Sequence, residues 1–238
     1  MRSCLLSTAT LVVAFSAVSL GAESPGETRR AELAARFGAA QRANGGLLRS
    51  YIWQSRTQVQ VEGETKKVLL YEVRFDLDGK VQRTEVGGTA PPQKSSRRKR
   101  GVRARIAKKK QEKGQELARL VTDVAKDYTM ASAGTWLDFF QRASYHDGEG
   151  DLEGTTRVQA GGFLVAGDTV KIWIDSGTDL PRQFEFWTTR DGQVVEGTVE
   201  YRAIEDGPNY PARTVIRLPG KRLMEAKVEN FDYRETQP

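Results

Sequence analysis

The chain has 238 residues, of which 38% are hydrophobic and 29% are charged, and it carries a formal net charge of +6. This length suits one domain, or one domain with an insertion, and the apolar content is sufficient for a core. Cys4 is the only cysteine and His146 the only histidine. The composition therefore excludes a disulfide framework and the usual zinc ligand sets in the mature chain.

The first 22 residues have the features of a secretory signal peptide. Arg2 supplies the positive charge, residues 5–20 are apolar, and small residues at 19–22 offer a cleavage site. The apolar stretch is too short for a stable membrane span, and a buried N-terminal helix is the less favoured interpretation. We therefore expect export to the periplasm and a single domain over residues 23–238.

A helix and three long strands are expected after the signal peptide. Pro25 and Glu27 follow Ser24 in a capping pattern, and Leu33 and Phe37 form a narrow apolar stripe. The glycines at 45 and 46 are expected to end this helix after residue 44. Alternation of apolar and polar residues then predicts strands over residues 48–61, 67–75 and 80–86.

The composition changes at residue 87, where glycines and prolines end the sheet. From Lys94 to Lys113 every charged residue except Glu112 is basic, so we place a basic insertion at about residues 88–114. It is either a solvated segment or a contact with an anionic membrane surface. Nucleic acid is a poorer partner, because no aromatic residue interleaves the run. The predicted surface contacts are Arg97, Arg98, Lys99, Arg100, Arg103, Arg105, Lys108, Lys109 and Lys110.

Two helices are expected between the insertion and the second group of strands. The first has apolar residues at helical spacing, namely Leu117, Leu120, Val121, Val124 and Tyr128. The second covers residues 135–142, where Thr135 and Asp138 fit a capping box and the apolar face is bulky. We expect both helices to pack on the sheet.

The remaining chain predicts about seven more strands, most clearly over residues 161–201. Apolar and aromatic residues alternate there with polar ones, and Asp191-Gly192 is a tight hairpin signal. Strands in runs, without alternation of strand and helix, indicate an α+β fold on an antiparallel sheet. A sheet of this size must curl. We therefore expect an unclosed half β-barrel with helices covering its concave face.

The residues that could carry catalysis or bind a metal do not complete any known motif. His146 lacks a serine in a Gly-x-Ser-x-Gly elbow, and no glycine-rich phosphate loop occurs. The acidic run from Asp147 to Glu153 resembles part of a calcium loop, but Leu152 and Val158 replace the required glycine and glutamate. We expect a solvated acidic loop, no enzyme, no metal and no cofactor.

Four motifs follow one another in the second half of the chain: VKIWIDSGTDLPR at 170–182, FWTTRDG at 186–192, EY at 200–201 and GPNYPAR at 207–213. Together they resemble the outer-membrane lipoprotein-sorting, LolA/LolB-like, carrier superfamily. The resemblance implies an unclosed barrel with an apolar lining and a helical lid, which carries acyl chains across the periplasm. It also implies an arginine that holds the lid closed, for which Arg49 and Arg56 are candidates by position. The basic insertion departs from the family pattern.

The favoured function is a monomeric periplasmic carrier that holds acyl chains of a lipid or lipid-modified protein in an apolar cavity. The predicted lining is Tyr51, Trp53, Tyr71, Val73, Phe75, Ile172, Ile174, Phe184 and Phe186, and the predicted lid is Leu120, Val124, Trp136, Phe139 and Phe140. One alternative is a non-catalytic envelope interaction or regulatory module with a filled core. Another is a membrane-surface or polyanion binder that acts through the basic helix. A large apolar pocket favours the carrier, and a packed interior favours the module.

Overall fold

The computed structural model describes residues 25–76, 78–89, 105, 116, 119–121, 123–125, 127–128, 131–147, 152–220 and 223–236. The predicted signal peptide, most of the basic insertion and the centre of the acidic run lie outside these residues. Of the predicted surface contacts only Arg105 is described, and it is helical and exposed.

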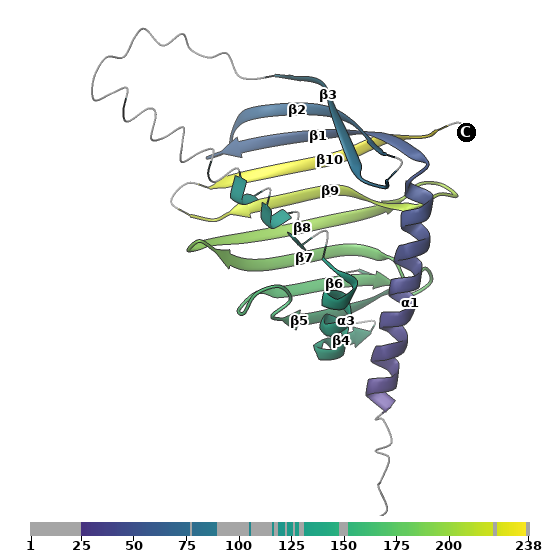
Figure 1. Ribbon diagram of the computed structural model, residues 1–238. Helices are drawn as coiled ribbons and strands as arrows, with labels where there is room; N and C mark the ends of the chain where they lie inside the picture. Colours follow the sequence, from purple (N-terminus) through teal and green to yellow (C-terminus); the bar gives the residue numbers. More distant parts are fainter. Residues whose placement is uncertain are drawn as a thin grey trace, which may run out of the picture.

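Ten strands form one antiparallel sheet in the order β3-β2-β1-β10-β9-β8-β7-β6-β5-β4 (Figure 1). Within the described residues β3 and β4 are its two edges, so the sheet does not close into a barrel. This confirms the predicted α+β half barrel. The strands are β1 Tyr51–Val61, β2 Glu64–Phe75, β3 Val81–Thr89, β4 Ser144–Asp147, β5 Thr155–Gly161, β6 Thr169–Asp175, β7 Pro181–Arg190, β8 Gln193–Ala203, β9 Asn209–Leu218 and β10 Met224–Glu235.

Short turns fix how neighbouring strands are aligned. Asp191 and Gly192 join β7 to β8 with φ values of 52° and 69°, and a similar pair, Glu62-Gly63, joins β1 to β2. Two successive residues with positive φ suit the twist of a hairpin, which explains the glycine at the second position. Pro181 is the first residue of β7, as expected for a residue that cannot donate to the sheet.

The helices are α1, Pro25–Leu48, and α3, Ala133–Arg142, with further helical residues between 119 and 128. The predicted end of α1 at residue 44 is wrong, because the helix continues through both glycines to Leu48. The predicted cap of α3 is also wrong by one turn. Ser132 is the N-cap, and its hydroxyl accepts a hydrogen bond from the backbone N–H of Thr135 at 3.1 Å.

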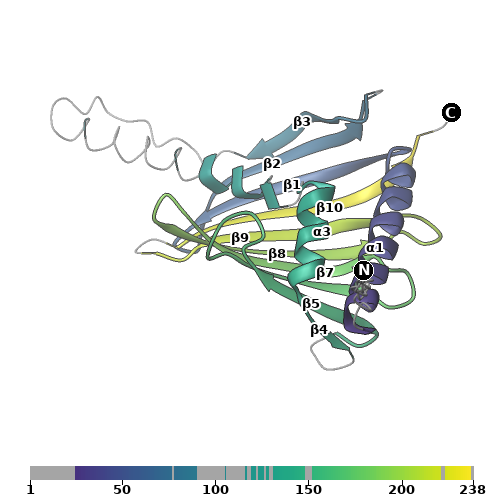
Figure 2. The same cartoon turned by 60° about the horizontal axis from the view of Figure 1, so that its bottom comes forward.

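Both helices lie against the same, concave face of the sheet (Figure 2). One continuous core joins them to the strands, with Phe37 of α1, Phe139 and Phe140 of α3, and Tyr128 all buried against β5 to β10. This confirms that the helices cover the concave face. None of the helices described is both long enough and apolar enough to span a lipid bilayer.

Candidate functional site

The strand registers place the predicted lining residues on the concave face. Trp53 lies opposite Val73, and Ile172 lies opposite Phe184. Directly opposed residues in neighbouring strands point to the same face. Directly opposed residues continue this face from β7 to β1. Phe186 lies opposite Gly197, Gly197 opposite Ile216, Ile216 opposite Ala226, and Ala226 opposite Val59. The concave face therefore continues without a break across both halves of the sheet.

The half of this face on β6 and β7 is filled by the protein's own side chains. Ile172, Ile174, Phe184 and Phe186 are at most 2% exposed. The ring of Tyr128 stacks on Phe186 with centroids 4.3 Å apart. The predicted lid residues pack into the same core or against it, namely Leu120, Val124, Trp136, Phe139 and Phe140. The structure thus brings the predicted lid and this part of the predicted lining together.

The half of the face on β1 and β2 carries a second aromatic cluster. Trp53 and Val73 are buried, whereas Tyr51, Tyr71 and Phe75 are half-buried. The ring of Trp53 is 5.6 Å from that of Phe75. These five predicted residues therefore lie apart from the α3 core but on the same face.

Tyr233 is a member of this second cluster that the sequence pattern missed. It stacks on Trp53 with centroids 5.3 Å apart and also contacts Tyr210 at 4.1 Å. The alternation along β10 would direct Tyr233 to the convex face. A register shift opposite Trp53, with Asp232 at a φ of 56°, reverses the alternation and brings Tyr233 inward.

Polar contacts attach the covering helices to the sheet. The buried carboxylate of Asp168 accepts a hydrogen bond from the hydroxyl of Tyr128 at 2.7 Å. Burial and this bond raise the pKa of Tyr128 above its ordinary value. Arg190 of β7 pairs with Asp127 at 3.1 Å, and Arg142 of α3 donates to the carbonyl of Gly161 at 2.9 Å. These groups, from strands, loops and helices, hold the cover in place.

Arg56, one of the two candidates by position for holding the lid, pairs with a strand residue instead. Its guanidinium donates to the carboxylate of Glu229 on β10 at 3.0 Å, and this pair lies on the convex face of the sheet. Arg49, the other candidate, lies beside Gly79 in the turn between β2 and β3. Arg190 is an arginine of the sheet that contacts a helical residue of the cover. Its position beside the Asp191-Gly192 hairpin gave no indication of this contact.

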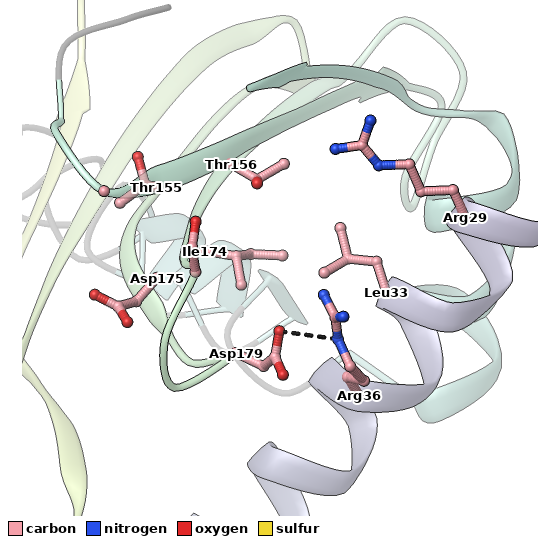
Figure 3. A pocket seen from close by; sticks show the side chains of 10 residues that line it. Arg29, Leu33, Arg36, Thr155, Thr156, Ile174, Asp175 and Asp179 are labelled. Carbon is pink, nitrogen blue, oxygen red and sulfur yellow. Dashed lines mark ion pairs between the residues drawn. The ribbon is translucent and has the colours of Figure 1, made fainter. Parts of the chain in front are cut away.

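Two adjoining cavities, of about 430 and 370 Å³, lie between α1 and the ends of β5 and β6 (Figure 3). Both are lined by Arg29, Leu33, Arg36 and Thr156. The larger also includes Gly154, Thr155, Ile174, Asp175, Ser176 and Asp179, and the smaller includes Glu32 and Tyr145. Ile174 is the predicted lining residue that borders them. We call the larger cavity the α1–β6 pocket.

The α1–β6 pocket has an apolar floor and a charged rim. Leu33 and Ile174 belong to the buried core, and they are 7% and 1% exposed. On the rim, Nε of Arg36 is 3.3 Å from Oδ1 of Asp179. The spacing of Arg29, Leu33 and Arg36 in α1 is the sequence signal that could have indicated this pocket. Among the described residues, no group of His, Cys, Asp and Glu is suited to hold a metal ion.

No family model and no curated protein matches the sequence. Solved structures to which this chain is similar include a LolA superfamily protein from Nitrosomonas europaea, at 11% identity and a TM-score of 0.38, over 84% of this chain and 93% of that one. A DUF1329 family protein from Desulfovibrio piger is similar at 12% identity and a TM-score of 0.41, over 88% of this chain and 93% of that one.

A putative outer membrane lipoprotein-sorting protein domain from Vibrio parahaemolyticus also matches, at 12% identity and a TM-score of 0.41, over 86% of this chain and 93% of that one. The chain is thus similar to these three structures at TM-scores of 0.38 to 0.41. TM-scores this low carry no argument about function, so the function has to be argued from the concave face and the α1–β6 pocket.

Proposed function

We propose that this protein is an exported, monomeric carrier that binds the acyl chain of a lipid or lipid-modified protein on its concave face in the periplasm. The observation that carries the proposal is the α1–β6 pocket, whose floor consists of the core residues Leu33 and Ile174. An apolar chain that enters there meets the same core that the covering helices occupy. The pocket is thus a suitable entrance to the concave face.

Binding of a chain requires the cover to move, because its aromatic side chains occupy the concave space. Phe139 and Phe140 are at most 1% exposed, and Trp136 packs with its ring centroid 5.9 Å from that of Phe184. An acyl chain would replace these apolar contacts with similar ones, so the apolar area removed from water changes little. The exchange then depends on the few polar contacts that hold the cover, such as Tyr128 with Asp168.

Native mass spectrometry of the protein purified from the cell envelope tests this proposal. A retained lipid mass is the expected result, and delipidated protein should take up a fluorescent fatty acid that a native lipid extract displaces. Protein that is lipid-free when isolated and fails to bind the fatty acid would contradict the carrier function.

A filled interaction module is the second candidate, and the packed aromatic core beneath α3 favours it. In that case the covering helices never leave the sheet, and the concave face serves stability alone. Hydrogen exchange separates the two candidates. The carrier predicts that amides near Tyr128 and in α3 exchange faster than those of β7 and β8, whereas the module predicts equal protection.

The basic insertion is proposed to bring the carrier to an anionic membrane surface. Its positive charge is dense enough to attract acidic lipid head groups at moderate salt. Deletion of residues 94–113 should reduce retention on vesicles that contain phosphatidylglycerol and leave retention on neutral vesicles unchanged. Equal retention of the deletion variant and the full chain on acidic vesicles would exclude this role.

A further inference from the structure

We propose that the outer edge of β3 binds an extended segment of a partner protein, which joins the sheet as an antiparallel strand. The segment carries a basic, an acidic and an apolar residue at alternate positions, beside Glu85, Arg83 and Val81. Such binding concerns the protein part of a partner, so it goes beyond the proposed function and does not depend on an acyl chain.

The outer side of β3 has no strand beside it within the described residues (Figure 1). Val81, Arg83 and Glu85 are exposed along this edge. An edge strand presents backbone N–H and C=O groups that can bond to another extended chain, which is a common way for a sheet to bind a peptide. Strand pairing is therefore available on this side of the sheet.

The hydrogen bonds to β2 indicate which backbone groups of β3 point outward. The N–H of Asp76 donates to the carbonyl of Lys80 at 2.9 Å, so these two residues form a hydrogen-bonded pair. Hydrogen-bonded and non-hydrogen-bonded pairs alternate along an antiparallel ladder, and Gln82 and Thr84 therefore bond to their partners in β2. The remaining residues have their N–H and C=O groups on the outer edge, namely Val81, Arg83 and Glu85.

The side chains of these three residues share the concave face, because Arg83 lies directly opposite the buried Val73. An added antiparallel strand places one of its own residues beside each of them. Opposite charges are favourable in such cross-strand pairs, whereas like charges are unfavourable. The edge thus selects a base beside Glu85, an acid two residues later beside Arg83, and an apolar residue two further on beside Val81.

A short segment of a partner fits this edge better than a second copy of the chain or the basic insertion. The regular edge covers only residues 81–85, since a register shift leaves Val86 without a partner in β2. This is a usual strand length, but it is far below the roughly 20–30 residues a side of a stable interface between folded proteins. The basic insertion offers Glu112 as its only acid to pair with Arg83.

Two labelled peptides of equal composition test this proposal on the mature full-length protein. TKTETVT carries the matching order of charges, and TETKTVT carries the reversed order. The matching peptide should bind about tenfold more tightly in fluorescence anisotropy, because two cross-strand pairs differ between opposite and like charge. Hydrogen exchange should show new protection of the Val81, Arg83 and Glu85 amides, whereas the Gln82 and Thr84 amides change little.

A charge-swapped variant gives a second comparison. Arg83→Glu with Glu85→Arg should reverse the preference, so that TETKTVT binds about tenfold more tightly than TKTETVT. Arg74→Glu with Glu72→Arg is the matched control, because it swaps two exposed charges on the convex side of β2 and should leave the preference unchanged. All four side chains are exposed, so the thermal stability of both variants should stay close to that of the parent chain.

The possible failures are distinguishable. Equal binding of the two peptides, absence of binding at millimolar concentration, or a preference that the swap does not reverse overturns the proposed strand addition. Peptide binding that leaves the outer amides unprotected overturns it as well, because the charges then act without strand pairing. A dimer in analytical ultracentrifugation, with these amides protected in the absence of peptide, identifies a second copy as the occupant and overturns the partner segment. Lipid retention is measured separately, so none of these results affects the carrier function.

Discussion

The hydroxyl of Tyr128 donates a hydrogen bond of 2.7 Å to Oδ2 of Asp168, and both side chains are almost completely buried. The same carboxylate accepts bonds from the backbone N–H groups of Phe163, Leu164 and Val165. One aspartate therefore fixes the loop between β5 and β6 and a helical residue of the cover. This makes the Tyr128–Asp168 contact the clearest point at which the cover could be released.

Tyr128→Phe should lower the free energy of unfolding by about 1.5–3 kcal/mol, because it removes a buried hydrogen bond to a charged acceptor. Tyr145→Phe is the matched control, since Tyr145 donates to the neutral carbonyl of Phe140 at the same distance of 2.7 Å. Its loss should cost about 1 kcal/mol. Urea unfolding measures both. Equal losses would show that the charge on Asp168 adds nothing to the attachment of the cover.

Stability should fall in alkaline solution, because buried tyrosines must ionise on unfolding. Burial raises the pKa of Tyr201 to about 12, from about 10 in an unfolded chain. A raised pKa means that the contribution is complete below pH 10 and is lost as the pH rises from 10 to 12. The free energy of unfolding, measured from pH 8 to 12, should decrease less steeply in Tyr201→Phe. An unchanged slope would show that Tyr201 does not contribute.

Gly197 allows Phe186 to lie flat on the neighbouring strand. The two residues are directly opposite in β7 and β8, and a Cβ atom on Gly197 would be 2.1 Å from the phenyl ring. Gly197→Ala should therefore destabilise the protein by about 1–3 kcal/mol, or more if the stack with Tyr128 is lost. Gly87→Ala in β3 is the control, because a Cβ there meets no atom within 4 Å. Thermal unfolding of the Gly197→Ala and Gly87→Ala variants measures the difference in their stability.

Much of the fold could be predicted because one face of the sheet is buried and apolar, which gives each strand an alternating sequence pattern. A period of two in apolar residues reveals the inward face of a strand, and a shift by one residue would expose Phe184 and Phe186. Two-residue turns such as Asp191-Gly192 then fix the alignment of adjacent strands. The number of strands, the curled sheet and the face of every predicted lining residue follow from these local signals.

Features that depend on distant residues could not be predicted in this way. The inward position of Tyr233 depends on a local shift in β10 that alternation does not reveal. Asp168 has the sequence context of a turn residue, and its role appears only when Tyr128 is placed beside it. The α1–β6 pocket combines residues separated by more than a hundred positions, such as Arg29 and Ile174. The end of α1 at Leu48 could not be predicted either, because it depends on the contact of Asn44 with the distant Asn209.

Asn44 is directed into the interior and joins α1 to the sheet. Its side-chain amide donates to the carbonyl of Asn209 at 2.8 Å, and its oxygen accepts from the backbone N–H of Asn209 at 2.6 Å. Asn209 in turn donates to the carbonyl of Pro181 at 2.7 Å, so the contact links α1, β9 and β7. Gly45 and Gly46 consequently continue a helix that is held from the side.

Asn44→Ala should lower the free energy of unfolding by about 2–4 kcal/mol, because it leaves two backbone groups of Asn209 buried without partners. Asn44→Asp keeps the acceptor but loses the donor, so urea unfolding should show a loss at neutral pH as well. Protonation of the new carboxyl group at low pH restores a donor and should recover part of that loss. Arg42→Ala, an exposed change on the same helix, should stay within about 0.5 kcal/mol. A similarly small loss in Asn44→Ala would mean that apolar contacts alone position α1, and with it the two arginines of the α1–β6 pocket.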